Sequence, residues 1–303
     1  MSTVTGFDGT LRVAVASGKG GTGKTTLSVA LALSNEGNTV LLDCDVEEPN
    51  AALFLKQEAE EASPIHTAVN VPVPYVDNDR CTGCGICKEA CQYNAIIMLK
   101  KQVMFFHELC HSCGACTLLC PEKAIYEKEQ SIGQLSEWKH GKLSFIQGEM
   151  SIGKAMSPPI IRAVKKRAEA LAQQTKAELV ITDCPPGTSC PMIAAVRDNN
   201  AVILVTEATP FGLNDLKLAV ETMRKMDMPF GVVVNRCDVG DDRVQQYCSE
   251  EAIPLLAEIP HDRKVAEAYS SGKSLLSAGD TYKKILDDLR IAVRDLAMTR
   301  KTI

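Results

Sequence analysis

Short, wholly apolar runs alternate with longer amphipathic stretches through most of the chain. The apolar runs are rich in valine, leucine and isoleucine, and they predict strands at residues 11–16, 39–42, 179–182, 201–205, 230–234 and 255–259. The amphipathic stretches predict helices at residues 25–34, 160–175, 191–197, 213–226, 244–252 and 280–298. Strands that are apolar along their whole length, and that alternate with helices, are typical of a parallel sheet covered on both faces. The pattern therefore predicts an α/β fold in which a parallel sheet is flanked by helices.

This alternation breaks between about Pro72 and Glu129, where cysteine, glycine and short apolar pieces replace it. Two similar halves follow one another there: CTGCGICKEACQYNAI begins at Cys81, and CHSCGACTLLCPEKAI begins 29 residues later at Cys110. Such a repeat within an otherwise regular pattern indicates an inserted domain, which we place at residues 74–129. Residues 1–73 and 130–303 then form the α/β domain. After the insert, residues 135–138 and 142–146 predict a hairpin that turns at His140 and Gly141.

Composition and charge narrow the classes of partner. The 303 residues carry a net charge of −5, and no long lysine–arginine block is present, so a protein that binds nucleic acid by neutralising phosphates is not expected. No run of 18 apolar residues occurs, and MSTVTGFDGT at the amino end lacks the features of a signal peptide. Residues 299–303 are too short for a basic amphipathic membrane tail. We therefore expect a cytoplasmic protein without stable membrane anchoring.

Thirteen cysteines are an unusual number for such a protein, because thiols in the cytosol stay reduced rather than forming a disulfide framework. Eight of them form two runs with the spacing C-x₂-C-x₂-C-x₃-C, which is typical of bacterial ferredoxins whose fourth cysteine binds the other cluster. Zinc is the alternative for paired CxxC runs. The triple spacing occurs twice, however, and Pro121 follows the last cysteine, and both features favour iron–sulfur clusters over zinc. Gln92 replaces the usual proline after the first run, without removing a ligand. The expected ligands are Cys81, Cys84, Cys87 and Cys120 for one 4Fe–4S cluster, and Cys110, Cys113, Cys116 and Cys91 for the other.

A glycine-rich segment, SGKGGTGKTT, follows the first predicted strand and precedes the first predicted helix. It contains G-x-x-x-x-G-K-T, the loop whose backbone N–H groups surround the phosphates of a nucleotide. Lys24 is expected to bind the β- and γ-phosphates, and the hydroxyl of Thr25 to bind Mg²⁺. A glycine-rich turn without a ligand is the weaker alternative. The predicted phosphate-binding residues are Gly18, Lys19, Gly20, Gly21, Thr22, Gly23, Lys24, Thr25 and Thr26.

Lys19, a second lysine within the loop, resembles the deviant Walker A motif of the MinD/ParA/Mrp family of ATPases, which includes the nitrogenase iron protein. The resemblance extends over the whole α/β part of the chain. It implies an ATP-dependent homodimer in which Lys19 reaches the nucleotide of the partner. With the inserted ferredoxin domain, the chain resembles the MinD-like ATPases that carry such an insert, and its expected cofactors are ATP, Mg²⁺ and two 4Fe–4S clusters.

Three further motifs agree with this resemblance. DCDVEEPN resembles the switch I segment, which implies that Asp45 orients the attacking water and that Asp43 lies beside the metal; Lys19, Lys24 and Asp45 are then the catalytic residues. VITDCPPG resembles switch II and implies that Asp183 lies near Mg²⁺ through water. VVVNR and IPHD place Asn235, Arg236 and Pro260 around the adenine. Without the resemblance, the three aspartates are carboxylates at the strand ends where α/β sheets bind ligands.

The remaining cysteines, Cys44, Cys184, Cys190, Cys237 and Cys248, form no CxxC pair, unlike the bridging-cluster motif of Mrp-type carriers. They are interpreted as small apolar side chains, with a redox or metal site at the dimer seam as the alternative.

Three functions are compatible with these features. The first is an ATP-gated electron donor that docks on a redox protein, a metalloprotein client or a related ATPase. The second is an ATP-dependent factor that inserts a metal or cluster into a client, and the third is a redox-sensing, MinD-like spatial organiser. Two complete four-cysteine sets indicate permanent electron-transfer centres, which favours the first function over the second.

Overall fold

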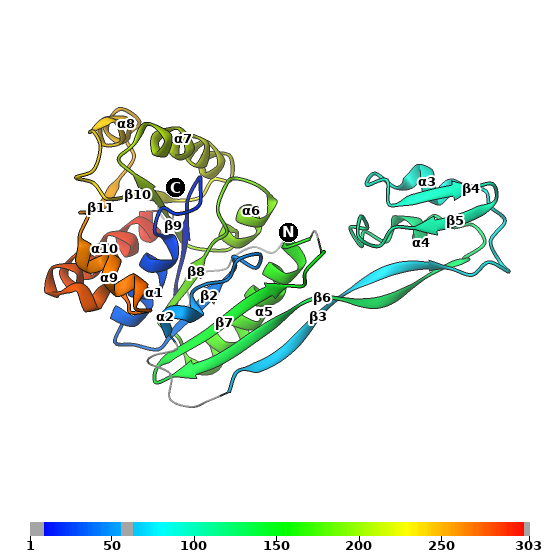
Figure 1. Cartoon of the computed structure of the whole chain (residues 1–303), viewed down its shortest axis with the longest axis horizontal. Coiled ribbons are helices and arrows are strands. Elements are labelled where there is room, and N and C mark those ends of the chain that lie inside the picture. Colours follow the sequence, from blue (N-terminus) through cyan, green and yellow to red (C-terminus); the bar gives the residue numbers. More distant parts are fainter. Residues whose placement is uncertain (1–8, 56–62, 155, 300–303) are drawn as a thin grey trace.

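The computed structural model describes residues 9–55, 63–154 and 156–299. One sheet of nine strands runs through the molecule in the order β11-β10-β9-β1-β8-β2-β7-β6-β3 (Figure 1). The strands from β11 to β7 are mutually parallel, whereas β6 is antiparallel to both of its neighbours. The strands are β1 (Leu11–Ala16), β2 (Thr39–Asp43), β3 (Ile65–Val76), β6 (Ile125–His140), β7 (Leu143–Met150), β8 (Leu179–Asp183), β9 (Ala201–Glu207), β10 (Phe230–Asn235) and β11 (Leu255–Ile259).

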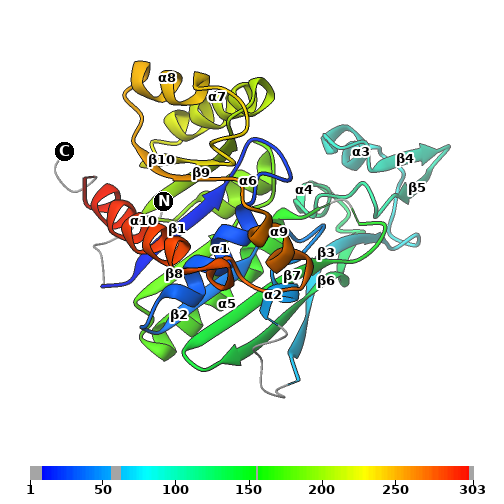
Figure 2. The ribbon, with the colours of Figure 1, turned by 60° about the vertical axis from the view of Figure 1, so that its left-hand side comes forward.

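Helices cover both faces of this sheet (Figure 2), and each face has its own apolar core. One core packs β1, β2 and β8 against α5 (Pro158–Thr175), α6 (Cys190–Val196), α7 (Pro210–Lys225) and α8 (Arg243–Glu250). The other packs the opposite side chains of the same strands against α1 (Lys24–Ser34), α2 (Ala52–Leu55), the 3₁₀ helix η1 (Leu275–Ala278) and α10 (Asp280–Thr299), with α9 (Arg263–Ser270) at its margin. Successive strand residues alternate between the two cores, which is the arrangement expected of strands buried on both faces.

The predicted α/β architecture is confirmed, including the hairpin, whose strands β6 and β7 pair Trp138 with Phe145. Strand β3 was missed. Pro72 and Pro74 indicated a break in regular structure, yet both lie within β3, where they pair with Glu129 and Glu127. Proline is tolerated there because β3 is the edge strand of the sheet, so a missing N–H leaves no neighbouring strand without a donor. Helix α9 and η1 were missed as well.

Strands β3 and β6 run on past the other strands as a two-stranded arm (Figure 1). The last residue pair of β3 and β6 that lies beside β7 is Val69–Gly133, since Gly133 in turn pairs with Met150, the last residue of β7. From Val69 to Val76 the arm extends about 23 Å. Its tip carries the cysteine-rich segment with α3 (Ile86–Ala90), α4 (Ala115–Leu118) and the hairpin of β4 (Ile96–Leu99) and β5 (Gln102–Phe105). The predicted domain limits, 74 and 129, fall within the arm and remain a prediction.

The backbone of this tip repeats with the sequence. Gly83 and Ser112 have φ of 71° and 52°, and Gly85 and Gly114 have φ of 84° and 72°. Asn94 and Lys123 have φ of 53° and 46°. The members of each pair are 29 residues apart, so both halves turn at matching positions with left-handed backbone. The internal repeat is therefore a repeat of structure as well as of sequence.

Within the described residues, no helix is both long and apolar enough to cross a membrane. The expectation that the chain has no signal peptide rests mostly on residues 1–8, which lie outside the described part of the chain. The same holds for residues 300–303, on which most of the expectation about a membrane tail rests.

The pairing of Trp138 with Phe145 gives a test of the hairpin's contribution to stability. Phe145 is 1% exposed, and its ring centroid lies 4.4 Å from that of Trp138 in an edge-on arrangement. Phe145→Ala is expected to lower the free energy of unfolding by about 3–5 kcal/mol, because it leaves a cavity in the core. Urea denaturation followed by circular dichroism measures the change. Phe211→Ala, at a side chain that is 78% exposed, is the matched control and should stay within about 0.5 kcal/mol of the parent protein. Equal stability of the two variants would contradict the assignment of Phe145 to the core.

Candidate functional site

The glycine-rich loop lies at the carboxyl edge of the sheet, between β1 and α1. Gly21 and Gly23 have φ of 78° and 97°, which favours glycine. A Cβ at Gly18 would lie 2.2 Å from the carbonyl oxygen of Asp215, so this glycine lets the loop pack against α7. A Cβ at Gly20 or Gly21 would meet nothing within 4 Å. The loop is therefore anchored at one side and open at the other, where a phosphate would approach its backbone.

Lys24 begins α1 with its side chain directed back into the loop. Its residue is 6% exposed, and its Nζ donates to the carbonyl oxygen of Lys19 at 3.4 Å. Burial lowers the pKa of Lys24, while the charges of Asp183 and Asp45 act in the opposite direction. A partly desolvated ammonium group held against backbone oxygen binds phosphate more strongly than it would in water.

Asp43 and Asp183 end neighbouring strands and are direct partners in the register of β2 and β8. The two carboxylates are 0% and 1% exposed. Burial, and the charge of Asp183, raise the pKa of Asp43 well above its usual range. Burial raises the pKa of Asp183 to about 6, against hydrogen bonds from Thr25 and Ser28 and the charge of Lys24. The ionised forms of both carboxylates are therefore disfavoured unless a cation lies beside them.

The two carboxylates differ in how they are bonded. Asp43 accepts from the backbone N–H groups of Asp45 at 3.1 Å and of Asn50 and Ala51 at 3.0 Å, so it holds the segment that follows β2. Asp183 accepts from the hydroxyl of Ser28 at 3.0 Å through Oδ1, while its Oδ2 has no partner in the described part of the chain. In this conformation Asp183 is the carboxylate with an oxygen available to a ligand.

Asp45 is half-buried in the segment after β2. Burial raises its pKa to about 6, although the charge of Lys24 and a backbone hydrogen bond from Glu48 lower it. The loop lysine and the predicted water-orienting aspartate therefore lie close enough to interact.

Two buried oxygens test whether this edge fits a nucleotide with magnesium. Buried polar atoms in folded proteins are almost always paired. Thr22 Oγ1, in the loop, and Asp183 Oδ2, at the strand end, are both buried without a partner among the described residues. An unpaired hydroxyl and an unpaired carboxylate oxygen, on either side of Lys24, suit a phosphate and a hard cation. The residues present thus fit Mg²⁺ and a phosphate, with Thr25 and Asp183 as the side chains that would hold the metal.

The residues expected around the adenine lie at the carboxyl ends of β10 and β11. Asn235, at the end of β10, donates from Nδ2 to the carbonyl oxygen of Thr22 at 2.9 Å, so it braces the phosphate loop. Arg236 is exposed and bonds to Glu207. Pro260, half-buried, follows β11, next to Ile259, whose oxygen accepts from Cys237 N. The structure brings these residues to one edge, and their contact with a base remains a prediction.

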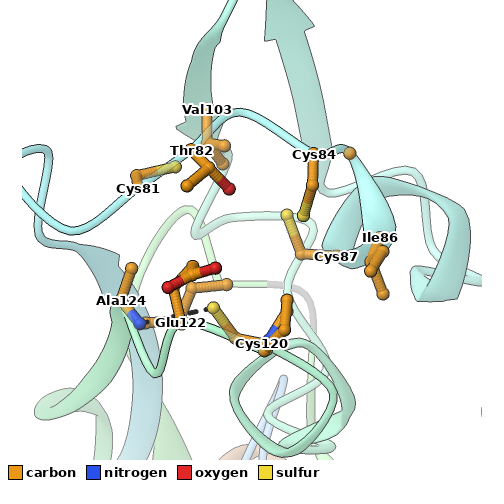
Figure 3. Close-up of a pocket in the computed structure, with 12 residues that line it drawn as sticks. Cys81, Thr82, Cys84, Ile86, Cys87, Val103, Cys120, Glu122 and Ala124 are labelled. Atoms are coloured by element: carbon orange, nitrogen blue, oxygen red, sulfur yellow. Dashed lines mark hydrogen bonds between the residues drawn. The ribbon is translucent and has the colours of Figure 1, made fainter.

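The eight spaced cysteines surround two hollows at the tip of the arm. The first, of about 340 Å³, is lined by Cys81, Cys84, Cys87 and Cys120 (Figure 3). The second, of about 420 Å³, is lined by Cys91, Cys110, Cys113 and Cys116. Each hollow thus combines three cysteines of one run with the last cysteine of the other, as the ferredoxin spacing predicts.

The chemistry around these sulfurs suits thiolates that bind iron. The backbone N–H of Ala124 donates to Cys120 Sγ at 3.3 Å, and that of Ser112 to Cys110 Sγ at 3.4 Å. Hydrogen bonds to sulfur stabilise thiolate ligands and influence the potential of a cluster. Among the described residues, no three acidic, histidine or cysteine side chains gather as tightly as a single metal ion requires.

The other cysteines divide by burial. Cys44 and Cys184 are 0% exposed and face the core under α5, α6 and α7, on the opposite side of the sheet from Asp43 and Asp183. Burial raises the pKa of both thiols, and it raises that of Cys248 to about 11. These three fill space in the core as predicted. Cys190 is exposed and Cys237 is half-buried.

Some residues of the site carry no motif and were missed. Ser28 bonds to Asp183 from one turn into α1, and Gln147 of β7 is the register partner of Asp43. Glu207, at the end of β9, forms ion pairs with Lys19 and Arg236. A signal existed for Glu207, which ends the apolar strand β9 at the carboxyl edge, and for Gln147, which directly follows the apolar run at 142–146.

Comparisons with known proteins agree with this geometry. The CbiA family, described as the CobQ/CobB/MinD/ParA nucleotide binding domain, matches residues 13–276. An uncharacterized protein of Methanocaldococcus jannaschii is 35% identical over 280 residues, covering 91% of this chain and 96% of that protein. An iron-sulfur cluster carrier protein of Pyrococcus abyssi is 26% identical over 294 residues, covering 89% of this chain and 80% of that one. An uncharacterized ferredoxin of Methanocaldococcus jannaschii is 37% identical over 57 residues, covering 18% of this chain and 74% of the ferredoxin.

A solved structure shares the fold. The septum site-determining protein MinD of Pyrococcus horikoshii, complexed with Mg-ADP, superposes with a TM-score of 0.54 at 19% identity. The match covers 97% of this chain and 100% of MinD. The family match spans most of the chain and takes in the phosphate loop, both buried aspartates and Asn235. This protein belongs to the CobQ/CobB/MinD/ParA family of nucleotide-binding proteins.

Proposed function

We propose that this protein uses ATP binding and hydrolysis to control electron transfer from two 4Fe–4S clusters to a redox protein or metalloprotein partner. The observation that carries the proposal is the pair of complete four-cysteine hollows on an arm whose strands continue the nucleotide-binding sheet. Four cysteines for each cluster leave no ligand position open for handing the cluster on. The clusters supply one-electron chemistry when they are bound. The chain's own residues hold them and connect them to the nucleotide edge.

A continuous set of backbone contacts connects that edge with the arm. Asp183 pairs with Asp43, and Asp43 pairs with Gln147 of β7. Beyond Asp45, the carbonyl oxygen of Val46 accepts from Met150 N at 2.8 Å. Ser151 N then donates to the carbonyl oxygen of Ile132, in β6, at 2.9 Å. A change in the segment that follows β2 therefore reaches the base of the arm directly, without passing along the length of β3.

Nucleotide-dependent homodimerisation is part of the proposal. Lys19 is the residue that the family resemblance places in the partner's nucleotide site, and its amine points to Glu207 rather than into its own loop. Ile152, after β7, and Phe211, at the start of α7, are 105% and 78% exposed near the same edge. Large apolar side chains exposed beside a ligand site are typical of a surface that another protein covers.

A second candidate is an ATP-dependent factor that inserts a cluster into a client. The observation in its favour is the similarity to the Pyrococcus abyssi protein named as a cluster carrier. Incubation of the cluster-loaded protein with an apo-ferredoxin distinguishes the two. Transfer of iron and sulfide that accelerates with ATP supports the carrier, whereas retention of both clusters through many ATP turnovers supports electron transfer.

The proposed spatial organiser has less support. The apolar face of α10 packs against the sheet, since Leu286, Leu289 and Val293 are buried in the core that covers β1 and β8. This face is therefore not available to bind a membrane. The likeness to MinD concerns the fold alone.

The cysteine hollows predict the metal content. Protein purified without oxygen should contain about eight iron atoms and eight sulfides per chain. Cys120→Ser should disturb the cluster of the first run, and Cys91→Ser that of the second, although each lies in the other run. Iron analysis with electron paramagnetic resonance of the reduced protein measures this. Cys248→Ser, in the core of the α/β domain, is the control and should retain both clusters. A stable protein with two zinc ions would contradict the assignment.

The position of Lys19 predicts its role in assembly. Lys19→Ala should weaken dimerisation in the presence of Mg²⁺ and ATP, and slow hydrolysis, because a positive charge beside the γ-phosphate is lost from a desolvated site. Nucleotide binding by the monomer should be largely retained through Lys24. Light scattering in an Asp45→Asn background, where hydrolysis is slowed, measures the assembly. Equal dimerisation with and without Lys19 would show that it does not act across the interface.

The contacts between the nucleotide edge and the arm predict a redox effect. Coupling between two sites typically amounts to about 1–3 kcal/mol, which corresponds to about 40–130 mV for one electron. The midpoint potentials of the clusters should therefore differ by about this amount between ADP and a non-hydrolysable ATP analogue. Linkage requires the affinity for ATP to differ between the oxidised and reduced protein by the same factor. Equal potentials and equal affinities would mean that ATP acts only through partner docking, and would move the cluster-insertion function ahead.

A further inference from the structure

Glu207, at the carboxyl end of β9, binds two basic side chains that come from different loops. Its Oε2 lies 3.3 Å from Lys19 Nζ, and its Oε1 lies 3.0 Å from Arg236 Nη1. The side chain of Glu207 is only 14% exposed, whereas those of Lys19 and Arg236 are 32% and 53% exposed. A shielded carboxylate thus holds two cations that are more accessible to solvent.

The backbone on both sides of this ion pair is fixed. The carbonyl oxygen of Lys19 accepts from the hydroxyl of Ser17 and from Nζ of Lys24. The carbonyl oxygen of Glu207 accepts from Thr209 N at 2.8 Å, and a Cβ at Gly212 would lie 2.3 Å from that oxygen. Because these hydrogen bonds hold the backbone at both residues, the direction of the Lys19 side chain depends on which anion it binds.

Arg236 lowers the free-energy cost of moving Lys19 from Glu207 to another anion. Removing one partner of a shielded ion pair normally leaves an uncompensated charge. When Lys19 leaves, Glu207 keeps its contact with Arg236, which sits one residue beyond Asn235 at the end of the neighbouring strand. The carboxylate therefore remains paired whether Lys19 binds it or binds elsewhere.

We propose that Glu207 is a positioning residue that holds Lys19 on its own protomer until the phosphates of a second, nucleotide-loaded copy compete for the lysine. This inference rests on the proposed ATP-dependent dimer. Glu207 then opposes premature assembly, and Arg236 takes up its charge once assembly has occurred. Without Glu207, the amine of Lys19 is free to reach the partner at lower protein concentration.

Glu207→Gln tests this proposal, because the amide keeps the shape and loses the charge. A single, partly exposed ion pair changes an equilibrium by about 1.5- to 5-fold, and a symmetric dimer contains two of them. The dissociation constant of the dimer, measured by analytical ultracentrifugation with Mg²⁺ and a non-hydrolysable ATP analogue, should therefore fall by about 2- to 25-fold. Glu251→Gln is the matched control. It removes an equal charge from an exposed ion pair between Glu251, which directly follows α8, and Arg224 of α7, and should leave the constant unchanged.

A second measurement reports on the contact itself. In the nucleotide-free protein, an amine-acylating reagent followed by mass spectrometry should modify Lys19 several-fold faster in Glu207→Gln than in the parent protein or in Glu251→Gln. Rescue by Glu207→Asp, which restores the charge on a shorter side chain, should be partial in both measurements.

The outcomes separate this inference from the proposed function. An unchanged or weakened dimer of Glu207→Gln, next to a parent and a Glu251→Gln control that dimerise, overturns the inference and leaves the function standing. Failure of all three proteins to dimerise overturns the proposed assembly instead. In that event the acylation rates still decide whether Glu207 holds Lys19, and equal rates would refute the contact.

Discussion

The structure depends on one unbroken set of backbone hydrogen bonds that runs from β8 through β2, β7 and β6 to β3. Asp183, Asp43, Gln147, Ser136 and His66 lie at corresponding positions on these five strands. The buried carboxylates lie at the inner end of this row, and β3, one of the two strands of the arm, lies at its outer end. Because strand register is defined to the residue, the distance and direction between the two ends are set by the sheet rather than by flexible linkers. The nucleotide edge and the cysteine-rich tip therefore belong to a single framework, although about 33 Å of β3 lies beyond the row.

The electrostatics of the inner end indicate a site that is incomplete on its own. Two carboxylates, each 1% exposed or less, share one strand pair, and only Asp43 has its oxygens fully engaged by backbone N–H groups. Burial favours the protonated form of both acids, whereas a bound cation would favour the ionised form. Lys24, whose charge is itself disfavoured by burial, offsets part of the cost at Asp183. Charges that are costly in the empty site make ligand binding more favourable, because the ligand relieves that cost.

Features that depend on neighbouring residues in the chain could be predicted from the sequence. The core strands, the phosphate loop and the cysteine runs each have a periodicity or spacing that is visible locally. Strand β3 could not be predicted, because its prolines weigh against a strand unless the strand is known to lie at an edge. Ser28 is a single polar residue within an ordinary helix, and only the packing of α1 on β8 brings it to Asp183. The place of Gln147 beside Asp43 likewise depends on the strand order, which the sequence does not give. The crossed grouping of the cysteines was predicted because ferredoxin spacing already encodes a long-range relation.

The way in which the arm begins and ends has a consequence for how such a protein can arise. Val76 and Ile125 are paired across the two strands, so the chain enters and leaves the cysteine-rich tip at points about 5 Å apart. A segment whose own two ends lie side by side can replace a simple turn at that place without moving any core strand. The α/β domain would need only a lengthened hairpin at the margin of its sheet to acquire the cysteine-rich module. A nucleotide-binding protein and a small cysteine-rich module can thus be combined by a single insertion event, with neither hydrophobic core having to be rebuilt.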